Sequence, residues 1–323
     1  MTRAPVALSC GEPAGIGPEI AAKAFDALRG AVPFFLIGDP THLPAGTPVA
    51  EIADPAQALA ITDALPVLRH DFPGAMNPGQ PDPRQAQAVI DVIARGVGLV
   101  QAGLASAVCT APVHKRALQN GAGFAYPGHT EYLAALAGAD NVAMMLASDR
   151  LRVVPATIHI PLAGVPAALT AKGLAATIRI THAALIRDFG IAAPRLAVAG
   201  LNPHAGEGGR IGHEETTLIA PLLDRLRDEG MQIAGPLSAD TMFHAAARAT
   251  YDAAIAMYHD QALIPIKTLD FDRGVNVTLG LPFVRTSPDH GTALDIAGRG
   301  IADPASLIEA LRMADRLGAA RAA

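Results

Sequence analysis

Three histidines, His159, His204 and His259, lie at or just past the carboxyl ends of strand-like apolar runs. In open α/β sheets, ligands bind beyond the carboxyl ends of the strands. Imidazoles that arrive there from three separate strands can converge on one ion. Three nitrogen ligands with an open position suit a catalytic divalent metal, zinc above all. The spacing is long, so the alternative is three unrelated polar histidines in loops or in the core.

A second group of residues has the chemistry of a phosphate site. His129 and Thr130 lie at an expected helix start, where backbone amides and the helix dipole favour an anion. The alternative there is that Thr130 only caps the helix. Lys267, Arg273, Asn276 and Arg285 follow His259 within one short, otherwise apolar region. Cations with an amide are what a dianionic phosphate requires, whereas a solvated surface is the alternative for any single one.

Acidic residues supply candidates for a general base or for a partner that orients a ligand. These candidates are Asp240, Asp260, Asp289 and Asp295. Asp260 directly follows His259, but adjacency in sequence does not place its carboxylate on that imidazole. Two glycine-rich segments, residues 11–19 and 206–212, follow expected strands and open expected helices. Neither has the spacing of a dinucleotide fingerprint. The first is an anion-binding or simple tight turn, and the second is expected to be a flexible loop beside His204.

Short β-rich runs that alternate with longer helical patterns must position these residues. The expected strands are 6–10, 34–38, 105–110, 142–147, 152–159, 196–200, 253–258 and 275–279. The expected helices are 18–29, 83–102, 131–137, 172–188, 214–229, 239–249 and 304–317. This alternation, with strands that read as continuously apolar, predicts an α/β fold with a largely parallel core sheet.

Composition narrows the class of protein. The 323 residues suggest about two domains, and the apolar half of the chain can form a sizeable core. A net charge of −5 and the absence of tryptophan argue against a nucleic-acid partner. Two cysteines suit a reducing compartment. We expect no membrane span and no signal peptide, and therefore a cytoplasmic protein.

Several long motifs stand out along the chain: GEPAGIGPE (11–19), YPGHTE (126–131), LNPHAGEGG (201–209), GPLSADT (235–241) and YHDQALIPIK (258–267). Together they resemble the 4-hydroxythreonine-4-phosphate dehydrogenase family of pyridoxine biosynthesis. The similarity runs from residue 6 to about residue 304, and Glu12 departs from it where aspartate is more usual. A further segment, DHGTALDIAGRGIADP (289–304), resembles the adenosine-binding loop of isopropylmalate and isocitrate dehydrogenases, which lack the Rossmann glycines.

The resemblance implies the two-domain fold of the isocitrate and isopropylmalate dehydrogenases. Residues 1–128 and 269–323 are expected to form the cofactor-side domain. Residues 129–268 are expected to form a middle domain that carries the metal ligands and the dimer interface. The family completes its metal site across a homodimer, which implies that His259 serves the neighbouring subunit. Residue by residue, the resemblance implies metal ligands His159, His204 and His259, substrate ligands His129, Thr130, Lys267, Asn276 and Arg285, and cofactor contacts Asp289, His290, Gly291 and Asp295.

The implied reaction is the oxidation of 4-phosphooxy-L-threonine at C3 with NAD or NADP. The product, 2-amino-3-oxo-4-phosphooxybutanoate, has a ketone β to its carboxylate and decarboxylates to 3-amino-2-oxopropyl phosphate. A divalent ion (zinc, cobalt or magnesium) would lower the pKa of the C3 hydroxyl. Asp240 and Lys267 are the candidate bases. The alternatives are a dehydrogenase of a phosphorylated threonate or erythronate or of a dihydrodiol acid and, in a different class, a phosphate acyltransferase.

Overall fold

The computed structural model describes residues 4–322, and the chain divides into two compact units. The first unit runs from the N-terminus to Asp140 and resumes at Leu281, and the second is Asn141–Gly280. Both boundaries lie further toward the C-terminus than those expected from the sequence. As a result, the helix that begins at His129 belongs to the first unit. In the described part of the chain, no helix has the length and apolarity required to cross a membrane.

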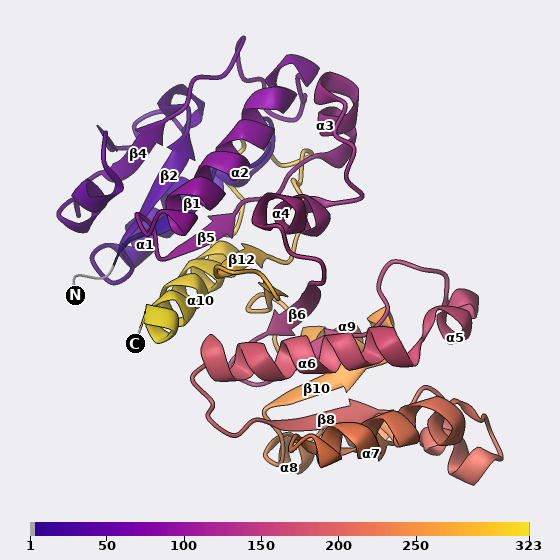
Figure 1. The fold of residues 1–323 in the computed structure, drawn as a ribbon. Helices are drawn as coiled ribbons and strands as arrows, with labels where there is room; N and C mark the ends of the chain where they lie inside the picture. Colours follow the sequence, from indigo (N-terminus) through magenta and orange to yellow (C-terminus); the bar gives the residue numbers. More distant parts are fainter. Residues whose placement is uncertain (1–3, 323) are drawn as a thin grey trace. The chain divides into compact units, whose positions relative to one another are not determined.

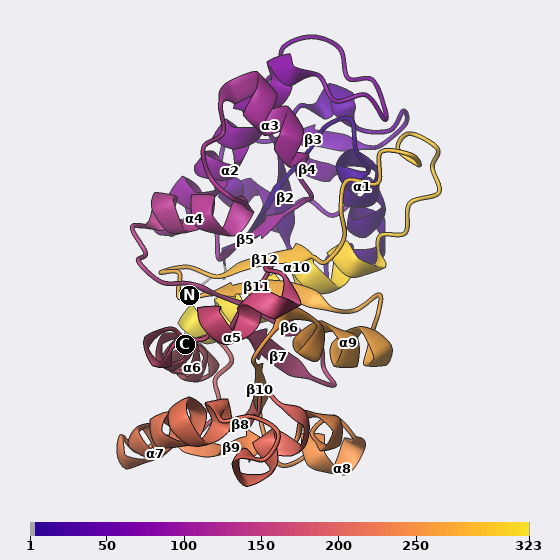
Figure 2. The same ribbon diagram turned by 90° about the vertical axis from the view of Figure 1, so that its right-hand side faces the viewer.

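The first unit is built on a parallel sheet with strand order β3-β4-β2-β1-β5-β12. Helices α1 and α10 cover one face of this sheet, and α2, α3 and α4 lie on the other (Figure 2). Its central strands are buried on both faces, which explains their continuously apolar sequences. The elements are β1 (Val6–Ser9), α1 (Gly17–Leu28), β2 (Phe34–Gly38), β3 (Val49–Glu51), β4 (Leu65–Arg69), α2 (Ala86–Gln101), β5 (Ala107–Thr110), α3 (Lys115–Ala122), α4 (His129–Ala137), β12 (Arg285–Pro288) and α10 (Ala305–Ala322).

The second unit has the strand order β11-β6-β7-β10-β8-β9, in which β6 is antiparallel to both neighbours and the other pairs are parallel. Helices α6 and α7 lie on one face, and α8 and α9 lie on the other (Figures 1 and 2). The elements are β6 (Ala143–Ala147), β7 (Arg152–Pro155), α5 (Val165–Ala168), α6 (Ala171–Arg187), β8 (Arg195–Ala199), α7 (Ala220–Asp228), β9 (Gln232–Leu237), α8 (Ala245–Arg248), β10 (Ala253–Ala256), α9 (His259–Leu269) and β11 (Val275–Leu279).

The strands of both units confirm the predicted α/β class with its largely parallel core, but several predicted elements need correction. The helix expected over 239–249 is a single turn at Ala239–Thr241 followed by the short α8. The helix expected over 214–229 begins with a wider π-type turn at Glu215–Ile219 before α7. The sequence analysis predicted no helix at α3 or α9 and no strand at β3, β4, β9 or β12.

The strand order of the second unit determines where the three histidines lie. Strands β7, β10 and β8 are consecutive neighbours and run parallel to one another. Their carboxyl ends therefore meet at one edge of the sheet. The loops that leave this edge carry His159, His259 and His204 respectively.

Candidate functional site

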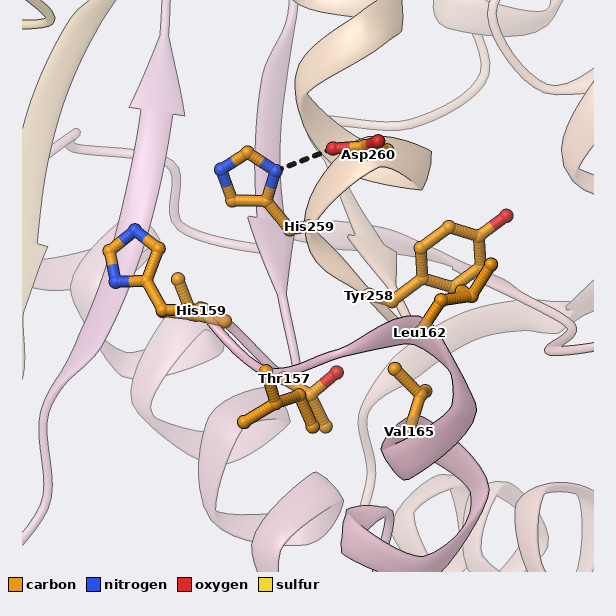
Figure 3. A pocket seen from close by; sticks show the side chains of 9 residues that line it. Thr157, His159, Leu162, Val165, Tyr258, His259 and Asp260 are labelled. Carbon is orange, nitrogen blue, oxygen red and sulfur yellow. Dashed lines mark hydrogen bonds and ion pairs between the residues drawn. The ribbon is translucent and has the colours of Figure 1, made fainter.

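Two of the three strand-end histidines face each other across a pocket. The ring centroids of His159 and His259 are 5.7 Å apart. Figure 3 shows both rings at one end of the lining, with Leu162, Val165 and Tyr258 at the other. Two imidazoles bound tetrahedrally to one ion at about 2.0–2.1 Å would have centroids roughly 5 Å apart. The pair therefore has a separation close to that of two ligands of one metal.

The carboxylate of Asp260 orients the His259 ring. The His259 Nδ1 and the Asp260 Oδ1 are 2.7 Å apart, so the adjacency in sequence does correspond to a contact. Both side chains are well exposed, and an ion pair of this kind contributes little to stability. Its effect is geometric, because a partner on one ring nitrogen fixes the tautomer and leaves Nε2 for a ligand.

The backbone at two of the histidines is strained. His159 has φ +43° and His204 has φ +53°, which is the left-handed region that non-glycine residues avoid. A conformation of this kind costs on the order of 1–3 kcal/mol and concentrates at functional sites. Neither ring has a hydrogen-bond partner in the part of the chain that the structure describes. Both rings are therefore available as nitrogen ligands, which suits a divalent metal.

His204 begins a left-handed turn and not the flexible loop expected from its glycines. Five consecutive residues, 204–208, have φ between +46° and +77°. The buried carboxylate of Glu215 anchors this turn, because it accepts hydrogen bonds from the backbone N–H of Asn202 at 2.7 Å and from the Asn202 side-chain amide at 2.9 Å. A Cβ at Gly206 would lie 2.6 Å from the Glu215 carboxylate, so the packing requires glycine there.

The structure does not bring the third histidine onto the pair. In residues 4–322 no group of three His, Cys, Asp or Glu side chains is placed to bind one metal ion. His204 instead acts electrostatically on Asp240. The Ser238 hydroxyl, which donates to the Asp240 carboxylate at 2.5 Å, is the main cause that lowers the pKa of Asp240, and His204 lowers it further. A lowered pKa weakens Asp240 as a proton acceptor.

In the first unit, three side chains at the ends of β5, α4 and β12 form a buried cationic cluster. The guanidinium of Arg285 donates to the Thr110 hydroxyl at 2.6 Å and lies 3.5 Å from the Nδ1 of His129. Burial lowers the pKa of Arg285 to about 10. Burial, and then the charge of Arg285, hold the pKa of His129 well below its usual value. His129 is therefore neutral beside a cation, and its Nε2 is buried with no partner among the described residues.

The predicted phosphate ligands belong to two different units of the chain. His129 is the first residue of α4 and Gly128 is its cap, so Thr130 does not cap the helix. Thr110, which contacts Arg285, was not predicted, although its place at the end of β5 was a usable signal. The other predicted phosphate ligands, Lys267 and Asn276, belong to the second unit. Asn276 has a buried Oδ1 with no partner among the described residues, and the Lys267 ammonium lies 5.7 Å from the centroid of the Phe271 ring.

The glycine-rich turn 11–19 and the adenosine-type loop 289–304 line one cavity of about 540 Å³ in the first unit. Gly15 from the turn 11–19 and Gly298 and Gly300 from the loop 289–304 contribute to its wall. The predicted cofactor contacts Asp289, His290, Gly291 and Asp295 belong to the same loop but lie outside this lining. The sequence analysis did not identify His42–Pro48, which also line the cavity.

Two charged side chains of α1 fasten that loop. The Lys23 ammonium donates to the backbone oxygens of Gly300 at 2.9 Å and Ala302 at 2.7 Å. The Glu19 carboxylate accepts from the backbone N–H groups of the same two residues at 3.2 and 2.8 Å. These bonds join the two ends of the chain around the cavity.

The chain is similar to known proteins in both sequence and structure. Residues 31–314 match the family described as pyridoxal phosphate biosynthetic protein PdxA. The 4-hydroxythreonine-4-phosphate dehydrogenase of Roseobacter denitrificans is 65% identical over 98% of both chains. The crystal structure of the Klebsiella pneumoniae enzyme of the same name has a TM-score of 0.91 at 38% identity over 98% of both chains. A terephthalate 1,2-cis-dihydrodiol dehydrogenase from Burkholderia xenovorans has a TM-score of 0.67 at 30% identity, covering 97% of this chain and 98% of its own.

The fold, the strand-end site and these relatives define an α/β oxidoreductase. More particularly, the chain belongs to the pyridoxal phosphate biosynthetic protein PdxA family, as its motifs predicted.

Proposed function

We propose that the protein oxidises 4-phosphooxy-L-threonine at C3 with NAD or NADP and a divalent metal. The oxidised product then loses carbon dioxide and gives 3-amino-2-oxopropyl phosphate. The observation that carries this proposal is the arrangement of β7, β10 and β8, three adjacent parallel strands that each deliver a histidine to one edge. The names of the close relatives support the choice of substrate.

We assign the metal to His159, His204 and His259. When bound, the ion (zinc, cobalt or magnesium) would polarise the C3 hydroxyl, and the nicotinamide would accept the hydride. Asp260 holds the ring of His259, and the left-handed turn holds His204. Lys267 or Asp240 takes the hydroxyl proton. Of the two, the lowered pKa of Asp240 makes it the weaker base.

The substrate phosphate is assigned to His129, Thr130 and Arg285, with Lys267 and Asn276 as the further ligands. A buried guanidinium presents a rigid fork of donors that matches phosphate oxygens. Neutral His129 can donate one more hydrogen bond through its Nε2. A dihydrodiol acid has no phosphate to match this cationic cluster, which favours the phosphorylated substrate.

The nicotinamide cofactor is assigned to the cavity between the turn 11–19 and the loop 289–304. The predicted contacts Asp289, His290, Gly291 and Asp295 belong to this loop, and Gly298 and Gly300 line the cavity. We place the enzyme in the cytoplasm, since Cys10 and Cys109 are both free and buried, as suits a reducing compartment.

The active enzyme is proposed to be a homodimer with its site at the subunit interface. Several exposed large apolar side chains of the second unit suit an interface: Ile160, Leu162, Ile211, Ile264 and Phe271. A second copy would also supply the third imidazole to the pair formed by His159 and His259. The resemblance assigns the crossing to His259, whereas the 5.7 Å separation of the His159 and His259 rings within one chain favours His204.

The test follows nicotinamide reduction by absorbance with NAD or NADP, with and without a chelator. The substrates are 4-phosphooxy-L-threonine, the phosphorylated threonate and a cis-dihydrodiol acid. We expect chelator-sensitive turnover of the first substrate, loss of turnover in His204→Ala, and full turnover in the control His182→Ala on α6. Turnover of only the second or third substrate would replace the proposed one. Full activity of His204→Ala after chelation would remove the metal assignment.

Mixed dimers test the shared site. If the site is shared, mixing inactive His204→Ala with inactive His259→Ala restores about a quarter of the activity, because half of the dimers then hold one intact site. Mixing His159→Ala with His204→Ala restores activity when His204 is the crossing ligand and does not when His259 is. No recovery in any mixture would show that one chain supplies all three ligands.

A further inference from the structure

The side-chain amide of Gln261 joins two of the histidine loops directly. Its Oε1 accepts the backbone N–H of Met257 at 2.6 Å, and its Nε2 donates to the backbone oxygen of Gly200 at 2.8 Å. Met257 precedes His259 at the end of β10, and Gly200 follows β8 on the way to His204. The backbone partners fix the orientation of the amide, because Met257 can only donate and Gly200 can only accept there.

The bridge lies where the sheet opens. The register between β10 and β8 runs through Ala253↔Leu196, Ala254↔Ala197 and Ile255↔Val198 and ends there. Extending the same register would set Met257 beside Gly200. The amide of Gln261 thus stands between the two strands as they separate. It satisfies one donor and one acceptor that the ladder no longer pairs, since such groups are costly when left without partners.

The third loop is tied to the same residue. Thr157, two residues before His159, donates to the backbone oxygen of Met257 through its hydroxyl at 2.8 Å and through its N–H at 3.2 Å. Met257 therefore connects with β7 through its oxygen and, by way of Gln261, with β8 through its N–H. Removing the amide would separate the His204 loop from the other two.

We propose that Gln261 is a positioning residue that fixes the spacing of the loops carrying His204 and His259. The consequence for metal binding rests on the proposed function. Gln261 belongs to α9, so the helix that begins at His259 also fixes the start of the His204 loop. Partners that orient metal ligands typically change affinity by about 10–100-fold when they are removed.

The experiment uses the full-length protein, freed of metal with a chelator, as wild type, Gln261→Leu, Gln261→Glu and the control pair Gln232→Leu and Gln232→Glu on the exposed β9. Amide hydrogen exchange is measured first, without metal. We expect Gln261→Leu to lose protection at Met257. Gln261→Glu keeps an acceptor for the Met257 N–H, but it places a second carboxylate oxygen next to the backbone oxygen of Gly200, which repels it. It should therefore retain protection at Met257 and lose it across residues 200–206. The Gln232 variants should match wild type.

Cobalt(II) is then titrated into each protein and followed by its visible absorption. We expect binding to be about 10–100-fold weaker in both Gln261 variants and unchanged in the control pair. Wild-type exchange protection in both Gln261 variants would overturn the bridge. Unchanged cobalt affinity despite lost protection would overturn its effect on the histidines. Failure of the wild type to bind cobalt would instead count against the proposed metal site, and the exchange data would still decide the bridge. If Gln261→Leu does not fold, the isosteric Gln261→Glu carries both measurements.

Discussion

Replacing Glu207 by glycine should stabilise this protein, which is the opposite of the usual effect of glycine. Glu207 has φ +46° inside the left-handed turn, and its side chain is exposed. A left-handed conformation costs an L-residue roughly 1–2 kcal/mol. Glycine avoids that cost but loses about 0.5–1 kcal/mol through the greater freedom of its unfolded chain. The net expectation is that Glu207→Gly is about 0.5–1 kcal/mol more stable than Glu207→Ala, which keeps the strained backbone.

The assay is urea denaturation of the metal-free protein followed by far-ultraviolet circular dichroism, since the chain has no tryptophan. Arg225, exposed within α7, supplies the matched control. Arg225→Gly should be about 1 kcal/mol less stable than Arg225→Ala, because glycine weakens a helix interior. The sign of the glycine–alanine difference must therefore reverse between the two positions. A Glu207→Gly protein less stable than Glu207→Ala would refute the left-handed turn.

Three further outcomes are expected. Arg285→Lys loses the planar fork of donors, and a hydrogen bond to a charged group is worth about 1.5–3 kcal/mol. Steady-state kinetics should therefore show a KM for the phosphorylated substrate that is roughly 10–100-fold higher, with a smaller change in kcat. Gly121→Ala would set a Cβ 1.9 Å from the Pro83 oxygen, so thermal denaturation should show a loss of about 1–3 kcal/mol in the free energy of unfolding. The control Gly98→Ala, whose Cβ would have no neighbour within 4 Å, should not lose stability. The pKa of His129 is lowered well below 6.5 in the folded state, so the unfolded chain takes up a proton that the folded chain refuses. Stability should therefore fall as the pH drops below about 6.5, and urea titrations of His129→Gln should show a shallower fall. Equal pH dependence of the two proteins would contradict this.

The buried strands were the most predictable part of the fold. The expected strands 34–38 and 275–279 coincide with β2 and β11. A parallel strand buried on both faces has to be continuously apolar, and this signal is local. The same signal located the three histidines at strand ends. That β7, β10 and β8 are neighbours could not be read from the sequence, because β10 follows β7 by almost a hundred residues and strand order depends on long-range packing.

The helices that the sequence analysis misjudged have local causes. Over 239–249, Ser238 donates to Asp240 and the ring of His244 accepts the N–H of Ala247, and side-chain bonds of this kind compete with a continuous helix. In α9 the helix continues through the proline at position 265, although proline usually interrupts a helix interior. No side chain caps this helix at Tyr258, so no local capping signal marks where it begins.

The candidate site was predictable in its residue types but not in its backbone. The glycines of 206–212 favoured a flexible loop, whereas the structure holds a left-handed turn through Glu215, which lies thirteen residues from the Asn202 that it binds. Nothing local in the sequence shows this bond, because it depends on the π-type turn that directs the Glu215 carboxylate inward. Asp260 on His259 is the opposite case, since its contact is between adjacent residues.

The strain at His159 and His204 has a consequence for affinity. Both residues have left-handed backbones. The hydrogen bonds that hold them come from Thr157 on one side and Glu215 on the other, so the protein itself offsets the cost of the unfavourable backbone. Binding that requires no further ordering of a loop retains more of its interaction free energy. The affinity of this edge for a metal should therefore depend on side chains that never touch the ion.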